Sequence, residues 1–481
     1  MTHFDKRNIS MMMDLYEMTM ANGYFVSGEQ TRRAVFDVFY RRNPDNGGFA
    51  IFGGLEQILE YIENIHFTQE DIDYFRSLQI FHEGFLSYLK DFRFTGDIYA
   101  FEEGRVMYPN EPVITVVAPL IEAQIIETVL LTLVNHQSLV ATKANRIVRA
   151  ARGRQVSDMG ARRAHNVDAA VYGARAAYIG GVANTATVLA GQMFQIPVVG
   201  TMAHSWVMSF PTEYDAFKRY AEIYPNHSVL LVDTYNTLDS GIPNAIRTAK
   251  EVLEPMGYRL KGIRIDSGDL AYLSKQARRM LDDAGLTDCK IIGSNSLDEY
   301  TITSILEQGG QIDSFGVGER MITAKSDATF GAVYKLAAIE YNGEMDSKIK
   351  LSENVEKITN PGHKQVYRIY SYDGHAIADL LTEYGEHPDL SQPYHYIDPL
   401  KPWKKHCFTN CSLKELQQQV VRNGKRITEK RSLHEIRDFV QQQLQTEIWP
   451  EEQRFENPHI HYLDFSPAYY KLKMKLLSKS R

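Results

Sequence analysis

Short apolar segments with polar or glycine-rich ends alternate with helical stretches through the middle of the chain. Six of these segments have the length and composition of buried strands, at residues 155–158, 196–201, 228–233, 261–266, 289–294 and 312–316. Helical patterns fill most of the intervals, at residues 212–223, 242–256, 271–284 and 298–308. Alternation of strand and helix predicts a parallel sheet or barrel. In such folds the reacting groups gather where the carboxyl ends of the strands open into loops.

The segments on either side of this region mix helices and strands without the same alternation. In the first segment, a stripe of apolar residues predicts an amphipathic helix at 55–62, with strands at 34–40 and 113–117 and one long or two bent helices at 121–151. In the last segment, the pattern predicts strands at 333–340 and 366–370 and helices at 412–419, 432–444 and 468–477. We therefore expect an α/β protein of three domains: an N-terminal α+β domain (1–140), an α/β barrel domain (141–335) and a C-terminal α+β domain (336–481) that packs against the first segment.

The bulk composition is that of an ordinary globular protein and excludes several classes of function. The chain has 481 residues, 44% of them apolar and 23% charged, with a formal net charge of −7. This balance provides no basic field for nucleic acid or anionic lipid, so we expect neither partner, and an anionic ligand must be held by local donors. No signal peptide is expected at the N-terminus, and the apolar stretch 113–121 is too short to span a bilayer. Three cysteines, an odd number, favour a reducing compartment, and we expect a cytoplasmic protein.

The fourth expected strand carries a guanidinium and a carboxylate on one face. Arg264 and Asp266 are two residues apart, and alternate residues of a strand point to the same side. The pair precedes a Ser-Gly-Asp loop and suits the mouth of a barrel that binds an anion. A buried structural ion pair is the alternative, although burying two charges costs desolvation energy.

Glycine-rich tips follow the fifth and sixth expected strands. They read Gly293-Ser294-Asn295 and Gly316-Val317-Gly318. Glycine lets backbone amides approach phosphate oxygens closely, and clusters of such amides bind anions without a net positive charge. Glycine after a strand is most often only part of a turn, so the two tips count as evidence only because they occur at successive strands.

A histidine lies three residues beyond the second expected strand. His204 follows Thr201 at this strand tip, and Asp233 ends the next strand. Asp233 could hold one ring nitrogen and leave the other nucleophilic, and a neutral imidazole can attack a phosphoryl group. A hydrogen-bonded core histidine is the alternative. Near the N-terminus, the string Asp-Leu-Tyr-Glu at 14–17 has the polarity of a solvated helix face.

Eight strings taken together resemble the nicotinate phosphoribosyltransferase family, in the same order over most of the chain. They are Asp-Leu-Tyr-Glu-Met-Thr-Met at 14–20, Ala-Thr-Lys-Ala-Asn-Arg at 141–146, Asp-Met-Gly-Ala-Arg-Arg-Ala at 158–164, Gly-Thr-Met-Ala-His-Ser at 200–205, Leu-Val-Asp-Thr-Tyr at 231–235, Ile-Arg-Ile-Asp-Ser-Gly-Asp at 263–269, Gly-Val-Gly at 316–318 and Gly-Ala-Val-Tyr-Lys-Leu at 331–336. Each string alone is weak evidence, whereas eight in register are highly specific.

The resemblance implies a fold and an activity. The fold is that of type II phosphoribosyltransferases, with an irregular α/β barrel, an N-terminal domain and a C-terminal α+β domain. The activity joins nicotinate to phosphoribosyl pyrophosphate, coupled to ATP hydrolysis with Mg²⁺, and gives nicotinate mononucleotide and pyrophosphate for NAD salvage. Members of the family are usually homodimers in which the neighbouring subunit completes the site.

The resemblance also assigns roles by position. It implies that ATP phosphorylates His204, that Tyr16 lines the nicotinate pocket from the other subunit, and that Thr201 and Arg264 contact nicotinate. It places Thr323 at the phosphoribosyl substrate. The positions where related enzymes hold phosphates are Arg162, Ser294, Gly316 and Gly318.

Two carboxylates complete the expected catalytic group, and one residue departs from the family pattern. Asp233 and Asp266 could hold the sugar, a metal-bound water or the positive charge that develops on the ribose. Met159 stands where the family often has a phenylalanine that stacks on the pyridine, and its sulfur can still contact a ring face.

Three alternatives to this function stay open on the sequence. A different barrel enzyme, such as an aldolase-type protein or a sugar-phosphate isomerase, would share the glycine-rich strand ends, and a catalytically silent nucleotide-binding dimer would share the fold. Nicotinamide phosphoribosyltransferase shares several of the strings, and competition between the acid and the amide would separate it.

Overall fold

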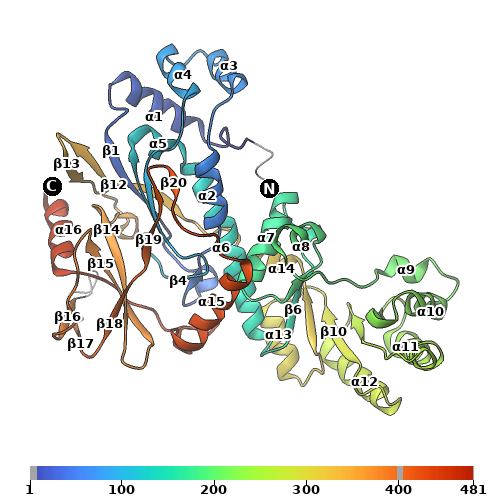
Figure 1. The fold of residues 1–481 in the computed structure, drawn as a ribbon. Coiled ribbons are helices and arrows are strands. Elements are labelled where there is room, and N and C mark those ends of the chain that lie inside the picture. The colour runs from blue at the N-terminus through green and yellow to red at the C-terminus, as the bar shows by residue number, and fades with distance from the viewer. Residues whose placement is uncertain (1–7, 398–402, 404, 480–481) are drawn as a thin grey trace. The chain divides into compact units, whose positions relative to one another are not determined.

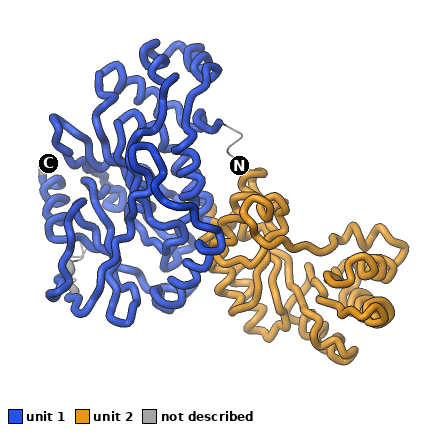
Figure 2. The backbone as a smooth tube through the Cα atoms, viewed as in Figure 1, with its two compact units in different colours: residues 1–139, 329–481 blue, residues 140–328 orange. Residues whose placement is uncertain are grey.

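The chain folds into two compact units, each of which is described by itself. The computed structural model describes residues 8–397, 403 and 405–479. Unit 1 combines the two ends of the chain, 1–139 and 329–481, and unit 2 is the intervening segment, 140–328 (Figure 2). The expected division into three domains stays a prediction, but the last segment does pack against the first, as expected, because both belong to unit 1.

Unit 2 is built on a six-stranded parallel sheet (Figure 1). In spatial order the strands are β7 (Asn184–Thr185), β6 (Gln155–Asp158), β11 (Ser314–Val317), β10 (Lys290–Ser294), β9 (Gly262–Ile265) and β8 (Val229–Leu231). This confirms the α/β class and the parallel sheet. Among the described residues the end strands β7 and β8 do not pair with each other, so the hydrogen-bonded ladder is open.

One of the six expected strands is wrong. Residues 196–201 do not form a strand, and only Val198 makes a single parallel bridge, to Thr185. The two-residue strand β7 occupies the sheet edge instead. Pro197 has no N–H to donate to a ladder, and Val198 is 53% exposed, so this apolar run is not a buried strand.

The helices between the strands begin and end close to the expected positions. Thr212, Asp269 and Asp298 accept hydrogen bonds from amides in the first turns of α10, α12 and α13, which fixes where these helices begin. The helices of unit 2 are α7 (Val167–Ile179), α8 (Val188–Phe194), α9 (His204–Met208), α10 (Glu213–Ile223), α11 (Ile242–Thr248), α12 (Leu270–Asp283), α13 (Glu299–Glu307) and α14 (Glu319–Ile322). The expected helix 242–256 continues beyond α11 as a π-helical segment and a 3₁₀ turn.

Unit 1 contains a seven-stranded antiparallel sheet that interleaves both ends of the chain (Figure 1). In spatial order the strands are β13 (Glu344–Ser347), β12 (Val333–Tyr341), β1 (Arg33–Phe39), β5 (Ile114–Pro119), β3 (Asp97–Phe101), β19 (Gln417–Arg422) and β20 (Lys425–Arg426). The three central strands come from the first segment, and the strands that flank them come from the last. The contact between the two segments is therefore a continuous hydrogen-bonded sheet.

A second, four-stranded sheet of unit 1 corrects another expectation. Its order is β18 (Ser412–Glu415), β14 (Lys364–Tyr370), β15 (Ala376–Glu383) and β21 (Leu463–Phe465). Residues 412–419 were expected to be helical, but they form β18 and the start of β19. Leucines and glutamines suit a helix locally, whereas pairing of β18 with β14 and of β19 with β3 overrides that preference.

The remaining elements of unit 1 are shorter strand pairs and helices. The strand pairs are β2 (Ala50–Ile51) with β4 (Val106–Met107), and β16 (Tyr394–Ile397) with β17 (Lys405–Phe408). The helices are α1 (Leu15–Val26), α2 (Leu55–Asn64), α3 (Gln69–Ser77), α4 (Glu83–Lys90), α5 (Leu120–Ile125), α15 (Leu433–Thr446) and α16 (Pro467–Lys479). Helix α6 (Glu127–Ala150) begins in unit 1 and ends in unit 2. The helical stretch expected at 121–151 therefore consists of two successive helices, α5 and α6.

A fully buried ion pair links the two central strands of the second sheet. Arg368 on β14 donates from Nε and Nη2 to the two carboxylate oxygens of Asp379 on β15, both at 2.8 Å. Both side chains are 0% exposed. Nε2 of His461 lies 3.5 Å from the same carboxylate. Burial lowers the pKa of His461, but its acidic neighbours Asp379 and Glu452 outweigh burial and raise the pKa above its ordinary value. A bidentate pair at such depth fixes the register of the two strands.

In the part of the chain that the structure describes, no helix combines the length and the apolar character that crossing a membrane requires.

Candidate active site

Arg264 is the centre of a polar cluster at the carboxyl ends of β9 and β10. Its Nε donates to Ser294 Oγ at 2.9 Å, its Nη1 to Thr201 Oγ1 at 3.3 Å and its Nη2 to Asp266 Oδ1 at 3.0 Å. Ser294 Oγ also donates to Asp266 Oδ1. Three of the five guanidinium N–H groups are thus used, which leaves two for a ligand.

His204 lies at the start of α9 and faces two carboxylates. Its Nε2 is 4.0 Å from Asp233 Oδ1 and 3.9 Å from Asp266 Oδ2. Its Nδ1 lies 3.1 Å from Thr234 Oγ1. The sequence suggested that Asp233 would hold one ring nitrogen, whereas in the structure Thr234 takes that place and Nε2 is the nitrogen that faces the acidic groups. The side chain is 41% exposed, so an incoming group can reach it.

Asp233 lies two residues after strand β8, its side chain is buried, and it accepts hydrogen bonds from the loop that follows β9. Its Oδ2 accepts hydrogen bonds from the Asp266 amide at 3.1 Å and from Ser267 Oγ at 2.5 Å. Its other oxygen, Oδ1, is buried without a hydrogen-bond partner. An unsatisfied buried carboxylate oxygen is costly unless a ligand completes it.

Gly316 on β11 makes room for Met159. A Cβ at Gly316 would lie 2.6 Å from the Met159 sulfur, and a Cβ at Gly318 would lie 3.2 Å from the Met159 carbonyl oxygen. The Met159 side chain therefore lies against β11, and an added Cβ at Gly316 would also lie 3.4 Å from the Ser294 Cβ. A Cβ at Gly316 would force Met159 to move, and the expected role of both glycines toward phosphate stays a prediction.

The two further predicted residues of unit 2, Thr323 and Arg162, lie after other strands of the sheet. Thr323 caps the short helix α14 and donates from Oγ1 to the Glu319 carbonyl at 2.8 Å. Arg162 is exposed in the 3₁₀ turn after β6. Both lie in loops that follow strands β11 and β6 of the same sheet.

Tyr16 belongs to unit 1, on α1, and is described there. It is 44% exposed, and burial together with the nearby Glu127 and Glu17 carboxylates raises its pKa. Glu17, next to it, is 0% exposed rather than part of a solvated face. Its Oε1 accepts hydrogen bonds from Thr128 Oγ1 and from the Asp14 amide, while Oε2 is buried without a partner, and burial raises its pKa to about 7.

Sequence reasoning missed two hydroxyl residues of the cluster. Thr234 and Ser267 were present in the quoted strings but received no role. Each hydroxyl directly follows a site carboxylate in the sequence, Asp233 or Asp266, and this position was the available signal.

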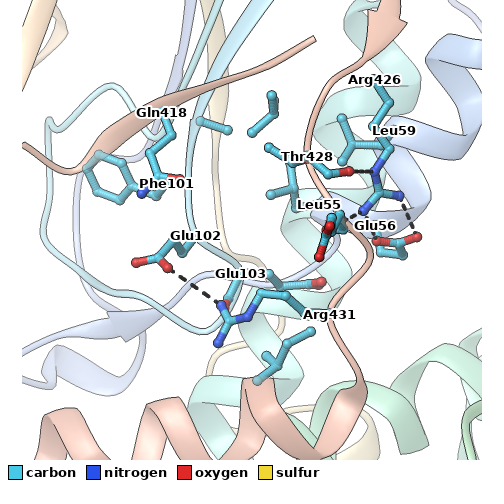
Figure 3. Close-up of a pocket in the computed structure, with 14 residues that line it drawn as sticks. Leu55, Glu56, Leu59, Phe101, Glu102, Glu103, Gln418, Arg426, Thr428 and Arg431 are labelled. Atoms are coloured by element: carbon cyan, nitrogen blue, oxygen red, sulfur yellow. Dashed lines mark hydrogen bonds and ion pairs between the residues drawn. The ribbon is translucent and has the colours of Figure 1, made fainter.

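A cavity of about 90 Å³ lies in unit 1 and is lined by none of the predicted site residues. Its charged side chains pair with one another, as Figure 3 shows: Arg426 with Glu56 at 2.8 Å, and Arg431 with Glu102 at 3.9 Å. Burial opposes ionisation of Glu56, but its bonds to Arg426 and Lys430 outweigh burial and lower its pKa. These pairs join the first and last segments of the chain and have the character of structural contacts.

The fold and the cluster define a class of protein: an α/β protein with a polar cluster of arginine, histidine and carboxylates at the carboxyl ends of parallel strands. Models of the nicotinate phosphoribosyltransferase (NAPRTase) family match nearly the whole chain. The N-terminal domain model matches residues 11–135, the family model residues 154–372 and the C-terminal domain model residues 363–473. The chain belongs to the nicotinate phosphoribosyltransferase family.

Individual relatives agree with this assignment. Nicotinate phosphoribosyltransferase of Bacillus subtilis (strain 168) is 44% identical over 473 residues, which cover 98% of this chain and 96% of the relative. The Dictyostelium discoideum enzyme of the same name is 33% identical over 93% of this chain and 85% of its own length. The crystal structure of human nicotinic acid phosphoribosyltransferase superposes with a TM-score of 0.84 at 27% identity, covering 97% of this chain and 99% of that one. A nicotinate-nucleotide pyrophosphorylase from Pyrococcus furiosus shares the fold, with a TM-score of 0.71 at 22% identity.

Proposed function

We propose that the protein is an ATP-coupled nicotinate phosphoribosyltransferase of NAD salvage. It converts nicotinate, phosphoribosyl pyrophosphate, ATP and water to nicotinate mononucleotide, pyrophosphate, ADP and phosphate. The observation that carries the proposal is the convergence of Arg264, His204, Asp233 and Asp266 at one end of the sheet in a chain that matches the family along its length.

The transfer step places particular demands on the site. The pyridine nitrogen of nicotinate has a lone pair and no proton, so it attacks C1 of the ribose without a general base. The C1–oxygen bond to pyrophosphate breaks as the C1–nitrogen bond forms, and positive charge develops on the sugar. Asp233, whose Oδ1 is buried and unsatisfied, and Asp266 supply negative charge that stabilises this state.

The two unused N–H groups of Arg264 suit the nicotinate carboxylate. A guanidinium binds a carboxylate through two parallel bonds, and the other three N–H groups are already fixed by Ser294, Thr201 and Asp266. The fixed guanidinium favours the acid over nicotinamide, whose amide carries no charge. This supports nicotinate rather than nicotinamide as the substrate. In this proposal Met159 contacts the pyridine face and Thr323 contacts the phosphoribosyl substrate. The residues that hold the phosphates are Arg162, Ser294, Gly316 and Gly318.

Mg²⁺ is the expected cofactor, and the donors present fit it in part. Magnesium prefers carboxylate oxygens and usually keeps several waters and substrate phosphates as ligands. Asp233 Oδ1, which has no hydrogen-bond partner, and Asp266 are the carboxylates that would hold it. Among the described residues no group of three acidic, histidine or cysteine side chains is arranged to hold a metal ion. When bound, the ion neutralises charge on the leaving pyrophosphate.

His204 is the proposed phosphate acceptor in ATP coupling. Thr234 contacts Nδ1, so Nε2 is the free nitrogen that attacks the γ-phosphorus of ATP, with ADP as the leaving group. Water later hydrolyses the phosphohistidine. While present, the phosphoryl group adds negative charge beside Asp233 and Asp266, and a change of about 1.4 kcal/mol in transition-state stability alters the rate tenfold.

The full site in this proposal needs a second copy of the chain. Tyr16 on unit 1 is the residue expected to reach the nicotinate pocket of the partner, which makes the enzyme a homodimer. A cytoplasmic location, favoured by the cysteine usage, belongs to the same proposal.

Two measurements test the function. Purified protein incubated with MgATP labelled in the γ-phosphate should acquire acid-labile phosphate, and His204→Ala should not. The same variant should lose stimulation by ATP while retaining slow transfer. Full acceleration of His204→Ala by ATP would exclude the phosphohistidine, and preferential turnover of nicotinamide in a competition assay would favour the amide-using enzyme instead.

A further inference from the structure

Lys143 is a buried lysine that connects three elements of unit 2. It lies on α6, within the string Ala-Thr-Lys-Ala-Asn-Arg, and its side chain is 3% exposed. Its ammonium donates to Glu299 Oε1 at 2.8 Å and to Ser326 Oγ at 2.7 Å. Glu299 begins α13, and Ser326 lies in the loop that follows α14. One ammonium therefore joins α6, the start of α13 and this loop.

The carboxylate that receives Lys143 is itself fixed. Glu299 is 0% exposed, and its Oε1 also accepts a hydrogen bond from Arg146 Nε at 2.8 Å. Arg146 is 2% exposed and belongs to the same string of α6. Buried charges are costly to desolvate, so a group of this kind is retained where it holds a particular geometry.

The loop that Lys143 holds continues from the predicted phosphoribosyl residue. Thr323 is three residues before Ser326, and Ala324 between them has a φ of +42°, in the left-handed region that alanine rarely adopts. Such a conformation costs on the order of 1 kcal/mol and persists only where surrounding contacts impose it. The Lys143–Ser326 bond is one such contact.

A second link ties the same loops together. Arg320 on α14 pairs with Asp298, the N-cap residue of α13. Asp298 and Glu299 are neighbours, so both ionic links end at the start of α13, directly after the loop that follows Ser294. Ionic links and the Lys143–Ser326 hydrogen bond thus connect the start of α13, which follows the loop after β10, with α14 and with the loop 323–328 that contains Thr323.

We propose that Lys143 is a positioning residue for the phosphoribosyl substrate. It does not touch the substrate; it holds residues 323–328 in the shape that presents Thr323. This inference rests on the proposed function. It predicts that loosening the loop weakens the use of phosphoribosyl pyrophosphate and leaves the use of nicotinate nearly unchanged.

The chain offers a matched control in Lys325. It lies on the same loop and also forms an ion pair, with Glu319 at 2.7 Å, but its side chain is 61% exposed. Surface pairs of this kind contribute little. Lys143→Met and Lys325→Met remove the same charge from the same neighbourhood, and only the first removes the bond to Ser326.

Steady-state kinetics of the full-length enzyme test the inference. Lys143→Met should raise the KM for phosphoribosyl pyrophosphate about tenfold or more, Ser326→Ala about threefold or more, and Lys325→Met less than twofold. The KM for nicotinate should stay within twofold in all three variants. The double variant Lys143→Met/Ser326→Ala should be no worse than Lys143→Met alone, because Lys143→Met already breaks the bond to Ser326 that Ser326→Ala removes.

Two outcomes would overturn the inference. One is an unchanged KM for phosphoribosyl pyrophosphate in Ser326→Ala, which decides the matter also if Lys143→Met does not fold. The other is an equal rise of both KM values, which indicates a general structural role. If the wild type itself does not consume nicotinate and phosphoribosyl pyrophosphate, the proposed function fails, and that result is distinct from a failure of the Lys143 variants in an active enzyme.

Discussion

Replacing Arg264 with lysine tests how the site selects a carboxylate. The arginine has two N–H groups left after its bonds to Ser294, Thr201 and Asp266, and the proposed nicotinate carboxylate takes both. A lysine keeps the charge but cannot reproduce the planar fork or hold all three partners. Each hydrogen bond to a charged group contributes about 1.5 to 3 kcal/mol. Loss of one such bond should lower kcat/KM for nicotinate by roughly 10- to 150-fold.

Nicotinamide should be affected less by the same change. Its amide carries no charge to pair with the guanidinium, so its kcat/KM should fall less than that of nicotinate. The assay is a competition between labelled nicotinate and nicotinamide, with the acid-to-amide ratio as the readout. Arg259→Lys is the control, since Arg259 is an exposed arginine of unit 2 that pairs with Asp288. An unchanged acid-to-amide ratio in Arg264→Lys would refute the assignment of Arg264 to the carboxylate.

Three further variants test the environment of the histidine, the Tyr16 helix and the core. Thr234→Val removes the hydroxyl 3.1 Å from His204 Nδ1 and should reduce ATP stimulation by roughly 2- to 12-fold, with ATP-independent transfer nearly unchanged; an equal fall in both rates would contradict this role. Burial raises the pKa of Glu17 from 4.5 to about 7, so the folded protein binds this proton more tightly than the unfolded chain and loses stability as the pH rises between these values. Glu17→Gln removes the titrating group and should narrow the difference between the urea midpoints at pH 5 and pH 8. An unchanged difference would contradict this role of Glu17. Arg368→Met leaves Asp379 buried without its bidentate partner and should cost about 3 to 5 kcal/mol in urea unfolding, whereas a loss below about 1 kcal/mol would show that the carboxylate finds another partner or a proton.

Local signals in the sequence located several helices, although the helix expected at residues 412–419 is wrong. Thr68 and Asp71 have the spacing of a capping box, with aspartate in place of the usual glutamate, and the structure contains both reciprocal hydrogen bonds at the start of α3. The lack of proline and glycine in 121–151 predicted a long helical stretch, which the structure realises as α5 and α6. Caps and helix breakers act over a few residues, so they can be identified without knowledge of the fold.

Strand assignments failed where burial is decided by distant parts of the chain. The apolar run 196–201 has the composition of a core strand, yet Val198 is 53% exposed and only bridges Thr185. Residues 412–419 have helix-forming side chains, yet they pair with β14 and β3, two strands that are far from each other in sequence. Neither outcome is encoded in the local pattern.

The candidate site was predictable because chain order places strand ends together. Parallel strands bring their carboxyl ends to one edge, so Arg264, Asp266 and Asp233 could be grouped without coordinates. The hydrogen bond of Thr234 to His204 and the burial of Glu17 could not, because both depend on side-chain directions and on helices packed from elsewhere. The substrate roles of these residues stay predictions that the variants above will test.

The interleaved sheet of unit 1 has a consequence for how the protein is made on the ribosome. Strand β1 pairs with β12 on one side, and β3 pairs with β19 on the other. Both outer edges of the three central strands therefore stay unpaired until strands hundreds of residues later in the chain have been translated. Residues 140–328 are complete before those partners emerge. Nascent chains should therefore acquire a protease-resistant middle before their beginning is protected, and a chain released early should expose sheet edges that invite aggregation.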